Sequence, residues 1–188
     1  MLDSAAARRV RLLGLDVDGV LTDNGVYLGL VGGEKVELKR FDIQDGLGLD
    51  VARKLGLTVA WISGRESSAT AVRARELGIE EVIQDSKARK LPAVEALRAR
   101  HGLAWDEIAF VGDDLADLPI LRRVGVPIAV ANAVDEVKRL ASFVTAAPGG
   151  RGAVREAIET LFRARGEWDE GVRRYLRDRD SGVEPVAG

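Results

Sequence analysis

Short apolar runs alternate along the chain with segments whose apolar residues recur at helical spacing. The runs have the length of buried strands and lie at residues 10–15, 58–62, 108–111 and 127–130. The helical patterns lie at residues 67–77, 91–100, 118–124 and 153–162. Strands that are joined through helices form right-handed βαβ units and a parallel sheet. The pattern therefore predicts a Rossmann-like α/β fold, a doubly wound parallel sheet flanked by helices.

One segment departs from this rhythm directly after the first strand. Apolar residues alternate with other residues over 26–30 and again over 36–38, and Gly32-Gly33 lies between the two stretches. Alternation on both sides of a glycine pair is typical of two antiparallel strands joined by a tight turn. The sequence therefore predicts a β-hairpin insertion at about residues 24–41.

The spacing of the remaining segments leaves little room for a second domain. About 40 residues separate Asp23 from Ser63, and the hairpin plus one helix use them, so we expect no cap domain. Residues 1–165 are predicted to form one domain. Residues 166–188 are dense in charge and then lose all periodicity, which predicts a flexible C-terminal tail.

Composition excludes several classes of protein. The chain of 188 residues has 28 basic and 30 acidic residues, and a net charge of −2 argues against a nucleic-acid partner. The absence of cysteine excludes thiolate metal sites, and the single histidine, His101, excludes a multi-histidine site. No apolar run approaches a membrane span, and the first residues do not resemble a signal peptide. We therefore expect a cytoplasmic protein with no membrane partner.

Acidic residues follow two of the predicted strands. Asp16-Val17-Asp18-Gly19 ends the first apolar run, and Gly112-Asp113-Asp114-Leu115-Ala116-Asp117 follows the run at 108–111. Because the carboxyl ends of parallel strands form the ligand crevice of such a sheet, these acids are expected to meet there. Two acid clusters at one edge indicate a site of oxygen ligands for a hard cation. The alternative for the first cluster alone is a solvated Asp-Gly turn.

Hydroxyl and basic residues follow the next strands along the chain. Ser63-Gly64-Arg65 offers a hydroxyl and backbone amides that suit an anion, although Ser63 could equally be a plain helix cap. Lys87, Arg89 and Lys90 stand where they could add a fixed positive charge to the same site, although such a cluster is usually a solvated face.

The order Asp, Asp, Ser, Lys, Asp at successive strand ends resembles the haloacid dehalogenase superfamily. The four motifs of that superfamily correspond to residues 16–22, 62–64, 90–91 and 112–117. The stretches 45–48 and 149–156 are also similar to those of its small capless phosphatases of eight- and nine-carbon sugar-acid phosphates. The resemblance covers about residues 10–165. It implies a Mg²⁺-dependent phosphomonoesterase that acts through an aspartyl-phosphate intermediate.

The resemblance also implies a role for each motif residue. Asp16 is the expected nucleophile and Asp18 the general acid and base. Ser63 and Lys90 are expected to hold the phosphoryl oxygens, with Lys87 as the alternative lysine. The expected Mg²⁺ ligands are Asp16, the backbone carbonyl of Asp18, and Asp113. Asp114 and Asp117 are expected to orient metal-bound water or Lys90 from behind.

The resemblance also implies a substrate, 3-deoxy-D-manno-octulosonate 8-phosphate (KDO 8-phosphate), an intermediate of lipopolysaccharide precursor synthesis. Its carboxylate needs positive charge far from the phosphate, and Arg65, Arg73 and Arg151 are the candidates. Arg65 and Arg73 are eight positions apart and are expected on one face of the same helix. Residues expected to contact the sugar hydroxyls are Asp42, Ile43, Gln44, Asp45 and Gly46. The alternatives are 2-keto-3-deoxynononate or N-acylneuraminate 9-phosphate.

The resemblance implies an assembly as well. In the family that the chain resembles, hairpins from four subunits associate, so a homotetramer is expected, with exposed hairpin edges as the contact surface. A function of another class remains open, because related domains that are fused to sugar-acid cytidylyltransferases serve assembly without catalysis.

Overall fold

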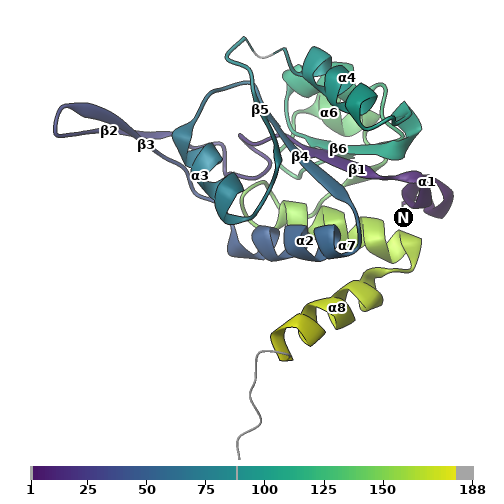
Figure 1. Ribbon diagram of the computed structural model, residues 1–188. Helices are drawn as coiled ribbons and strands as arrows, with labels where there is room; N and C mark the ends of the chain where they lie inside the picture. Colours follow the sequence, from purple (N-terminus) through teal and green to yellow (C-terminus); the bar gives the residue numbers. More distant parts are fainter. Residues whose placement is uncertain (1, 88, 181–188) are drawn as a thin grey trace, which may run out of the picture.

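The computed structural model of the protein describes residues 2–87 and 89–180 (Figure 1). The strands are β1 (Leu12–Leu15), β2 (Tyr27–Val31), β3 (Glu34–Leu38), β4 (Thr58–Ser63), β5 (Glu81–Gln84), β6 (Ile108–Gly112), β7 (Val126–Ala129) and β8 (Phe143–Val144). The helices are α1 (Ser4–Arg9), α2 (Ile43–Lys54), α3 (Ser68–Glu76), α4 (Lys90–Arg100), α5 (Leu118–Leu121), α6 (Asp135–Leu140), α7 (Ala153–Arg165) and α8 (Trp168–Asp180). Two short 3₁₀ turns cover Trp105–Glu107 and Leu115–Asp117.

Six parallel strands form the central sheet in the order β5-β4-β1-β6-β7-β8. Helices α2 and α7 cover one face and α4 and α6 the other (Figure 1). Strands β1, β6 and β7 are buried over their whole length, as expected for a sheet that is covered on both faces. The predicted Rossmann-like fold is confirmed.

The strand register places the predicted motifs side by side. Leu15 at the end of β1 lies opposite Trp61 of β4 and Val111 of β6. The residues that follow these positions, Asp16 among them, therefore leave the sheet at one common edge.

The predicted hairpin is present and projects from the body of the molecule (Figure 1). Strands β2 and β3 pair antiparallel, and an isolated bridge between Thr22 and Phe41 closes the base. Gly32 and Gly33 both have positive φ, at 60° and 87°, which the tight turn requires of its two central residues. From Asp23 to Ser63 the chain forms only the hairpin, α2, β4 and short connections, so no cap domain is inserted there.

The prediction of a flexible tail is wrong for residues 168–180, which form α8. Trp168 is buried, and the guanidinium carbons of Arg155 and Arg163 lie 5.0 and 5.9 Å from its ring centroid. Gly171 lies so close to α2 that a Cβ there would meet Leu55 at 2.7 Å. The dense charge belongs to the outer face of an amphipathic helix, where Glu170 pairs with successive arginines. The rest of the predicted tail, residues 181–188, lies outside the described residues.

Several boundaries differ from the sequence pattern. The helix that was expected over 118–124 ends at Leu121, and α1, β5, α6 and β8 have no predicted counterpart. All of these elements are short, and periodicity needs several turns or several alternations to be visible. Within the described ranges, no helix is long and apolar enough to cross a membrane.

Candidate active site

A cavity of about 240 Å³ lies at the carboxyl ends of β1, β4 and β6. Its lining combines four acids, two basic residues and three small or polar residues, namely Asp16, Asp18, Asn24, Gly64, Arg65, Lys90, Asp113, Asp114 and Ala116. These residues come from five separate stretches of the sequence. The parallel sheet therefore brings the two predicted acid clusters together, as expected.

The loop after β1 is held in one conformation by its neighbours. The Asp16 amide donates to the Val111 carbonyl at 3.0 Å, which extends the β1–β6 pairing by one residue. Gly19 has φ of +95°, and a Cβ there would lie 2.0 Å from the Asp113 carboxylate. Only glycine fits this position, because both the backbone conformation and the space exclude a side chain. The close approach is what allows Asp113 to reach the loop that carries Asp16.

Three buried carboxylates meet in the cavity and beneath it. Oxygens of Asp16, Asp113 and Asp117 all lie within 4.8 Å of one another. One buried cation accompanies them: Lys90 Nζ lies 2.6 Å from Asp16 Oδ1 and 2.8 Å from Asp117 Oδ1. Burial works against the charged form of Lys90, yet the two carboxylates together raise its pKa above the usual value. Lys90 is therefore a fixed positive charge beside Asp16.

One lysine does not balance three carboxylates. Burial, with the negative charge of Asp117, raises the pKa of Asp16 well above its usual value, although Lys90 acts in the opposite direction. Burial also raises the pKa of Asp113 to about 6. Asp113 Oδ1 is buried and accepts no hydrogen bond from the described residues. Clustered oxygens with unmet charge suit a hard divalent cation such as Mg²⁺, so the residues fit the metal that the sequence predicts.

Asp117 contacts Lys90 and the loop that carries Asp113. Its side chain is fully buried, and its Oδ2 accepts from the amides of Asp113 at 3.0 Å and Asp114 at 3.4 Å. Its Oδ1 holds Lys90. Asp114 itself caps the following 3₁₀ turn, where its Oδ1 accepts from the Leu115 amide at 2.7 Å. Asp117 thus joins Lys90 to the Asp113 loop, and its role in orienting them stays a prediction.

The geometry favours Lys90 over Lys87 as the phosphate lysine. Lys90 begins α4 and turns its ammonium group into the cavity. Lys87 is exposed, and its amide donates to Asp85 in a local turn at 2.8 Å.

Ser63 lies at the end of β4, is fully buried, and has its Oγ 3.4 Å from Asp18 Oδ2. Its Oγ also accepts from the Arg65 amide at 3.0 Å.

Two residues at the cavity are absent from the sequence-based prediction. Lys39, just after β3, has a fully buried side chain whose Nζ lies 2.6 Å from Asp18 Oδ1. In an alternating hairpin a lysine is expected to face solvent, so the sequence carries no signal for this contact. Asn24 lines the cavity with φ of 66°, a conformation in which asparagine is one of the few residues tolerated besides glycine.

The predicted sugar-binding residues separate into two groups. Arg65 lines the cavity, and its Nη2 lies 2.9 Å from Glu37 Oε2 of the hairpin. Arg151 is exposed in the loop before α7. Arg73 does not lie beside Arg65 as predicted: it pairs with Glu76 at 2.9 Å and lines a separate groove between α2, α3 and α8. The prediction fails because α3 begins at Ser68, so Arg65 precedes the helix and its helical spacing from Arg73 does not apply.

The predicted contact loop 42–46 is the start of α2 and does not line the cavity. Asp42 caps that helix by accepting from the Gln44 amide at 2.8 Å, and Gln44 is exposed. Asp45 is buried and accepts from the Arg155 amide at 2.8 Å, so it caps α7. Burial raises the pKa of Asp45 to about 6. Ile43 and Gly46 line the same separate groove as Arg73.

The chain is similar to known hydrolases. The family model of haloacid dehalogenase-like hydrolases matches residues 49–158. The chain belongs to this family of hydrolases. It is 42% identical over 166 residues to the 3-deoxy-D-manno-octulosonate 8-phosphate phosphatase of Escherichia coli strain K12, across 88% of this chain and 86% of that one.

Solved structures are similar over nearly the whole fold. The 3-deoxy-D-manno-octulosonate 8-phosphate phosphatase of Moraxella catarrhalis, in complex with magnesium ion, phosphate ion and KDO, is 35% identical with a TM-score of 0.85. The match covers 92% of this chain and 97% of that one. The corresponding phosphatase of Yersinia pestis is 36% identical with a TM-score of 0.83 and 88% coverage of both chains.

Proposed function

We propose that this protein is a Mg²⁺-dependent phosphomonoesterase that hydrolyses KDO 8-phosphate to KDO and phosphate. The observation that best supports this function is that Asp16, Asp113 and Lys90 line one cavity. The Asp16 carboxylate can attack phosphorus, and the Lys90 ammonium group is a fixed cation 2.6 Å from it. The named relatives act on this same substrate, which supports the choice of sugar. The reaction belongs to lipopolysaccharide precursor synthesis in the cytoplasm.

The first step transfers the phosphoryl group to the protein. An Asp16 oxygen attacks phosphorus, a bond from that oxygen to phosphorus forms, and the bond from phosphorus to the sugar oxygen breaks. Asp18 donates its proton to the departing sugar oxygen, which would otherwise leave as an unstable alkoxide. Lys90 and the Ser63 hydroxyl hold the phosphoryl oxygens while charge moves among them.

The second step releases phosphate. Asp18, now a carboxylate, takes a proton from a water molecule as the water oxygen bonds to phosphorus. The bond from phosphorus to Asp16 then breaks, and Asp16 and Asp18 return to their starting states. Because both steps use Asp18, its side chain must be placed with equal precision for an acid and a base.

Asp16, the Asp18 carbonyl and Asp113 are the groups that would hold Mg²⁺, which neutralises phosphate charge and orients the substrate when bound. Arg65, on the rim of the cavity, is placed to bind the carboxylate of the sugar acid. A guanidinium suits this task because it can donate two parallel hydrogen bonds to one carboxylate.

The hairpin provides the assembly surface of a homotetramer. All five residues of β2 are exposed, and Leu30 and Val31 are 76% and 68% exposed. An exposed apolar strand pair favours association with other copies. Hairpins from four copies associate and help to close each site. Light scattering at micromolar concentration is expected to give a tetramer mass, and a fully active monomer would contradict this.

The substrate is tested by phosphate release with saturating Mg²⁺ on KDO 8-phosphate, 2-keto-3-deoxynononate 9-phosphate, N-acylneuraminate 9-phosphate and an aryl phosphate. KDO 8-phosphate is expected to have the highest kcat/KM. Arg65→Ala is expected to lower kcat/KM for KDO 8-phosphate far more than for the aryl phosphate, whereas the matched Arg73→Ala changes neither. Preference for a nine-carbon substrate would overturn the choice of sugar, and no release from any substrate would favour a non-catalytic assembly module.

A further inference from the structure

A buried lysine from the hairpin touches the residue that moves protons in the proposed reaction. The Lys39 side chain has no exposed surface, and its Nζ lies 2.6 Å from Asp18 Oδ1. Two further oxygens hold the same ammonium group: Thr70 Oγ1 at 3.4 Å and Glu37 Oε1 at 3.8 Å. Because its side chain is buried and three oxygens lie around its ammonium group, Lys39 is fixed in place and not a free surface charge.

Glu37, one of the partners of Lys39, is itself held by two further residues. Glu37 accepts from the Ser67 hydroxyl at 2.6 Å and from Arg65 Nη2 at 2.9 Å. The Ser67 hydrogen bond, with the nearby positive charges of Arg65 and Lys39, lowers the pKa of Glu37. Ser67 also caps α3. The base of the hairpin is therefore joined by charged hydrogen bonds to the loop between β4 and α3, on the far side of Asp18.

The two carboxylate oxygens of Asp18 have different surroundings. Oδ1 is buried against Lys39. Oδ2 lies on the side of Ser63, 3.4 Å from its hydroxyl, where the phosphoryl group is expected. A carboxyl group whose first oxygen is occupied by a close ion pair has its second oxygen left to face the leaving group.

We propose that Lys39 is a positioning residue, which holds Asp18 Oδ1 so that Oδ2 carries the proton to the departing sugar oxygen. The hairpin thereby contributes to the reaction within its own subunit. This inference rests on the proposed phosphatase function and concerns the orientation of Asp18. A displacement of about 1 Å in such a group costs roughly 100-fold in rate.

The test uses leaving groups of different quality. An aryl phosphate leaves without protonation, whereas KDO 8-phosphate and ribose 5-phosphate require it. The parameter kcat/KM reports only steps up to formation of the aspartyl phosphate, so the later water step does not interfere. Lys39→Met, which fills a similar volume, is expected to lower kcat/KM about 10- to 100-fold for both sugar phosphates and less than about threefold for the aryl phosphate.

The controls separate positioning from other roles. Retained aryl phosphatase activity shows that the variant is folded, and Lys39→Gln serves if Lys39→Met does not fold. Lys39→Arg is expected to restore part of the lost rate. Lys138→Met, in α6 and outside the hairpin, is the matched control and is expected to change nothing. Ribose 5-phosphate has no carboxylate, so a loss there cannot come from Arg65.

Equal losses on all three substrates would overturn the positioning role, because a purely structural lysine would lower every rate alike. A loss on KDO 8-phosphate alone would also overturn it, since it would indicate carboxylate binding through Glu37 and Arg65. Failure of the wild-type protein to release phosphate from any substrate would instead contradict the proposed function.

Discussion

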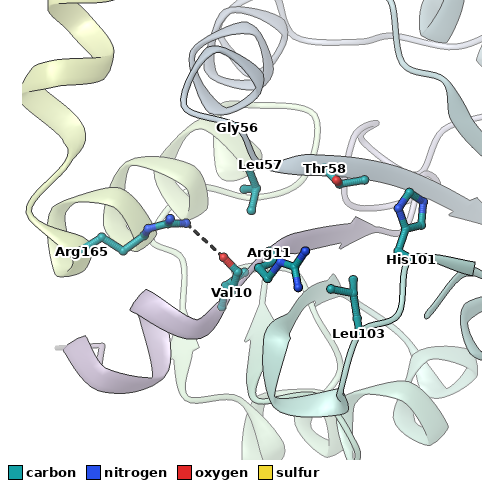
Figure 2. Close-up of a pocket in the computed structure, with 8 residues that line it drawn as sticks. All are labelled: Val10, Arg11, Gly56, Leu57, Thr58, His101, Leu103 and Arg165. Carbon is teal, nitrogen blue, oxygen red and sulfur yellow. Dashed lines mark hydrogen bonds between the residues drawn. The ribbon is translucent and has the colours of Figure 1, made fainter. Parts of the chain in front are cut away.

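Two cavities lie at opposite ends of the central strand β1, and both are lined by charged residues. The first is the acidic cavity at the carboxyl end. The second, of about 150 Å³, lies at the amino end, and Figure 2 shows its lining of Val10, Arg11, Gly56, Leu57, Thr58, His101, Leu103 and Arg165. Size and charge alone do not distinguish a functional site here.

The balance of charge does distinguish them. At the amino end each basic group of the lining contacts a carboxylate: Arg165 lies 3.0 Å from Glu167 and Arg11 lies 3.4 Å from Glu107. His101 lies 2.8 Å from Glu81, which also pairs with Arg100. Arg165 also donates to the Val10 carbonyl at 3.2 Å (Figure 2). These pairs lie near the surface, where such interactions mainly fix the ends of elements.

At the carboxyl end three buried carboxylates lie within 4.8 Å of one another, and Lys90 pairs with two of them, Asp16 and Asp117. Burying charge without a matching partner is costly, and proteins tolerate that cost where a ligand or a reaction uses it. The comparison indicates that unmatched buried charge, and not the shape of a cavity, distinguishes the reactive end of this sheet.

The largest expected difference between the two ends is in turnover. Asp16→Asn removes the attacking oxygen and is expected to lower kcat at least about 10⁴-fold on any phosphate ester. Steady-state phosphate release with added Mg²⁺ measures it, and circular dichroism checks the fold. Arg165→Ala at the amino end is the control and should leave kcat within about twofold. Normal turnover by Asp16→Asn would refute the assigned nucleophile.

The second difference concerns the one shared cation. Lys90→Met leaves Asp16 and Asp117 without their partner, so kcat is expected to fall about 100-fold and the free energy of unfolding by about 3 kcal/mol. Urea unfolding at neutral pH measures the second quantity. Lys87→Met, three residues earlier on the exposed loop, is the matched control and should change stability by less than about 0.5 kcal/mol. The opposite ranking would make Lys87 the functional lysine.

The third difference is the response to metal. Mg²⁺ at a hundredfold excess over its Kd is expected to stabilise the protein by about 2.7 kcal/mol, which raises Tm by about 5–10 °C for a chain of this length. Asp113→Asn should remove most of that shift, whereas Arg165→Ala should keep it. A shift that survives Asp113→Asn would place the cation elsewhere.

The smallest effect is expected at the amino end. Arg165→Ala loses the hydrogen bond to Val10 and the ion pair with Glu167, and should lower the free energy of unfolding by about 1 kcal/mol. Urea unfolding measures it. A coupled loss of Mg²⁺ affinity in the same variant would contradict the separation of the two ends.

Sequence patterns predicted the four inner strands of the sheet and the edge at which the acids meet. Each acid motif directly follows an apolar strand, so the parallel topology alone brings Asp16 near Asp113. The hairpin was equally visible, because its alternation and its glycine pair are local signals.

The contacts that depend on packing were not visible. Lys39 reaches Asp18 from the base of the hairpin, which the Thr22–Phe41 bridge closes, and alternation alone predicts a solvated lysine. Arg73 was predicted beside Arg65, yet Arg65 precedes α3 and Arg73 lines another groove. In α8 the charged residues hid the pattern of Trp168 and Gly171, which pack inward.

The central claim is that the phosphoryl group of the substrate is transferred to Asp16, a member of the buried acid cluster. The most direct measurement uses Asp18→Asn with Mg²⁺ and an aryl phosphate, quenched in acid and analysed by peptide mass spectrometry. The aryl group leaves without a general acid, but water is then not activated, so the intermediate accumulates. We predict one phosphoryl group per chain on the peptide that contains Asp16, with an equal burst of aryl alcohol. A burst without covalent phosphate, or phosphate on Asp113, would contradict the claim.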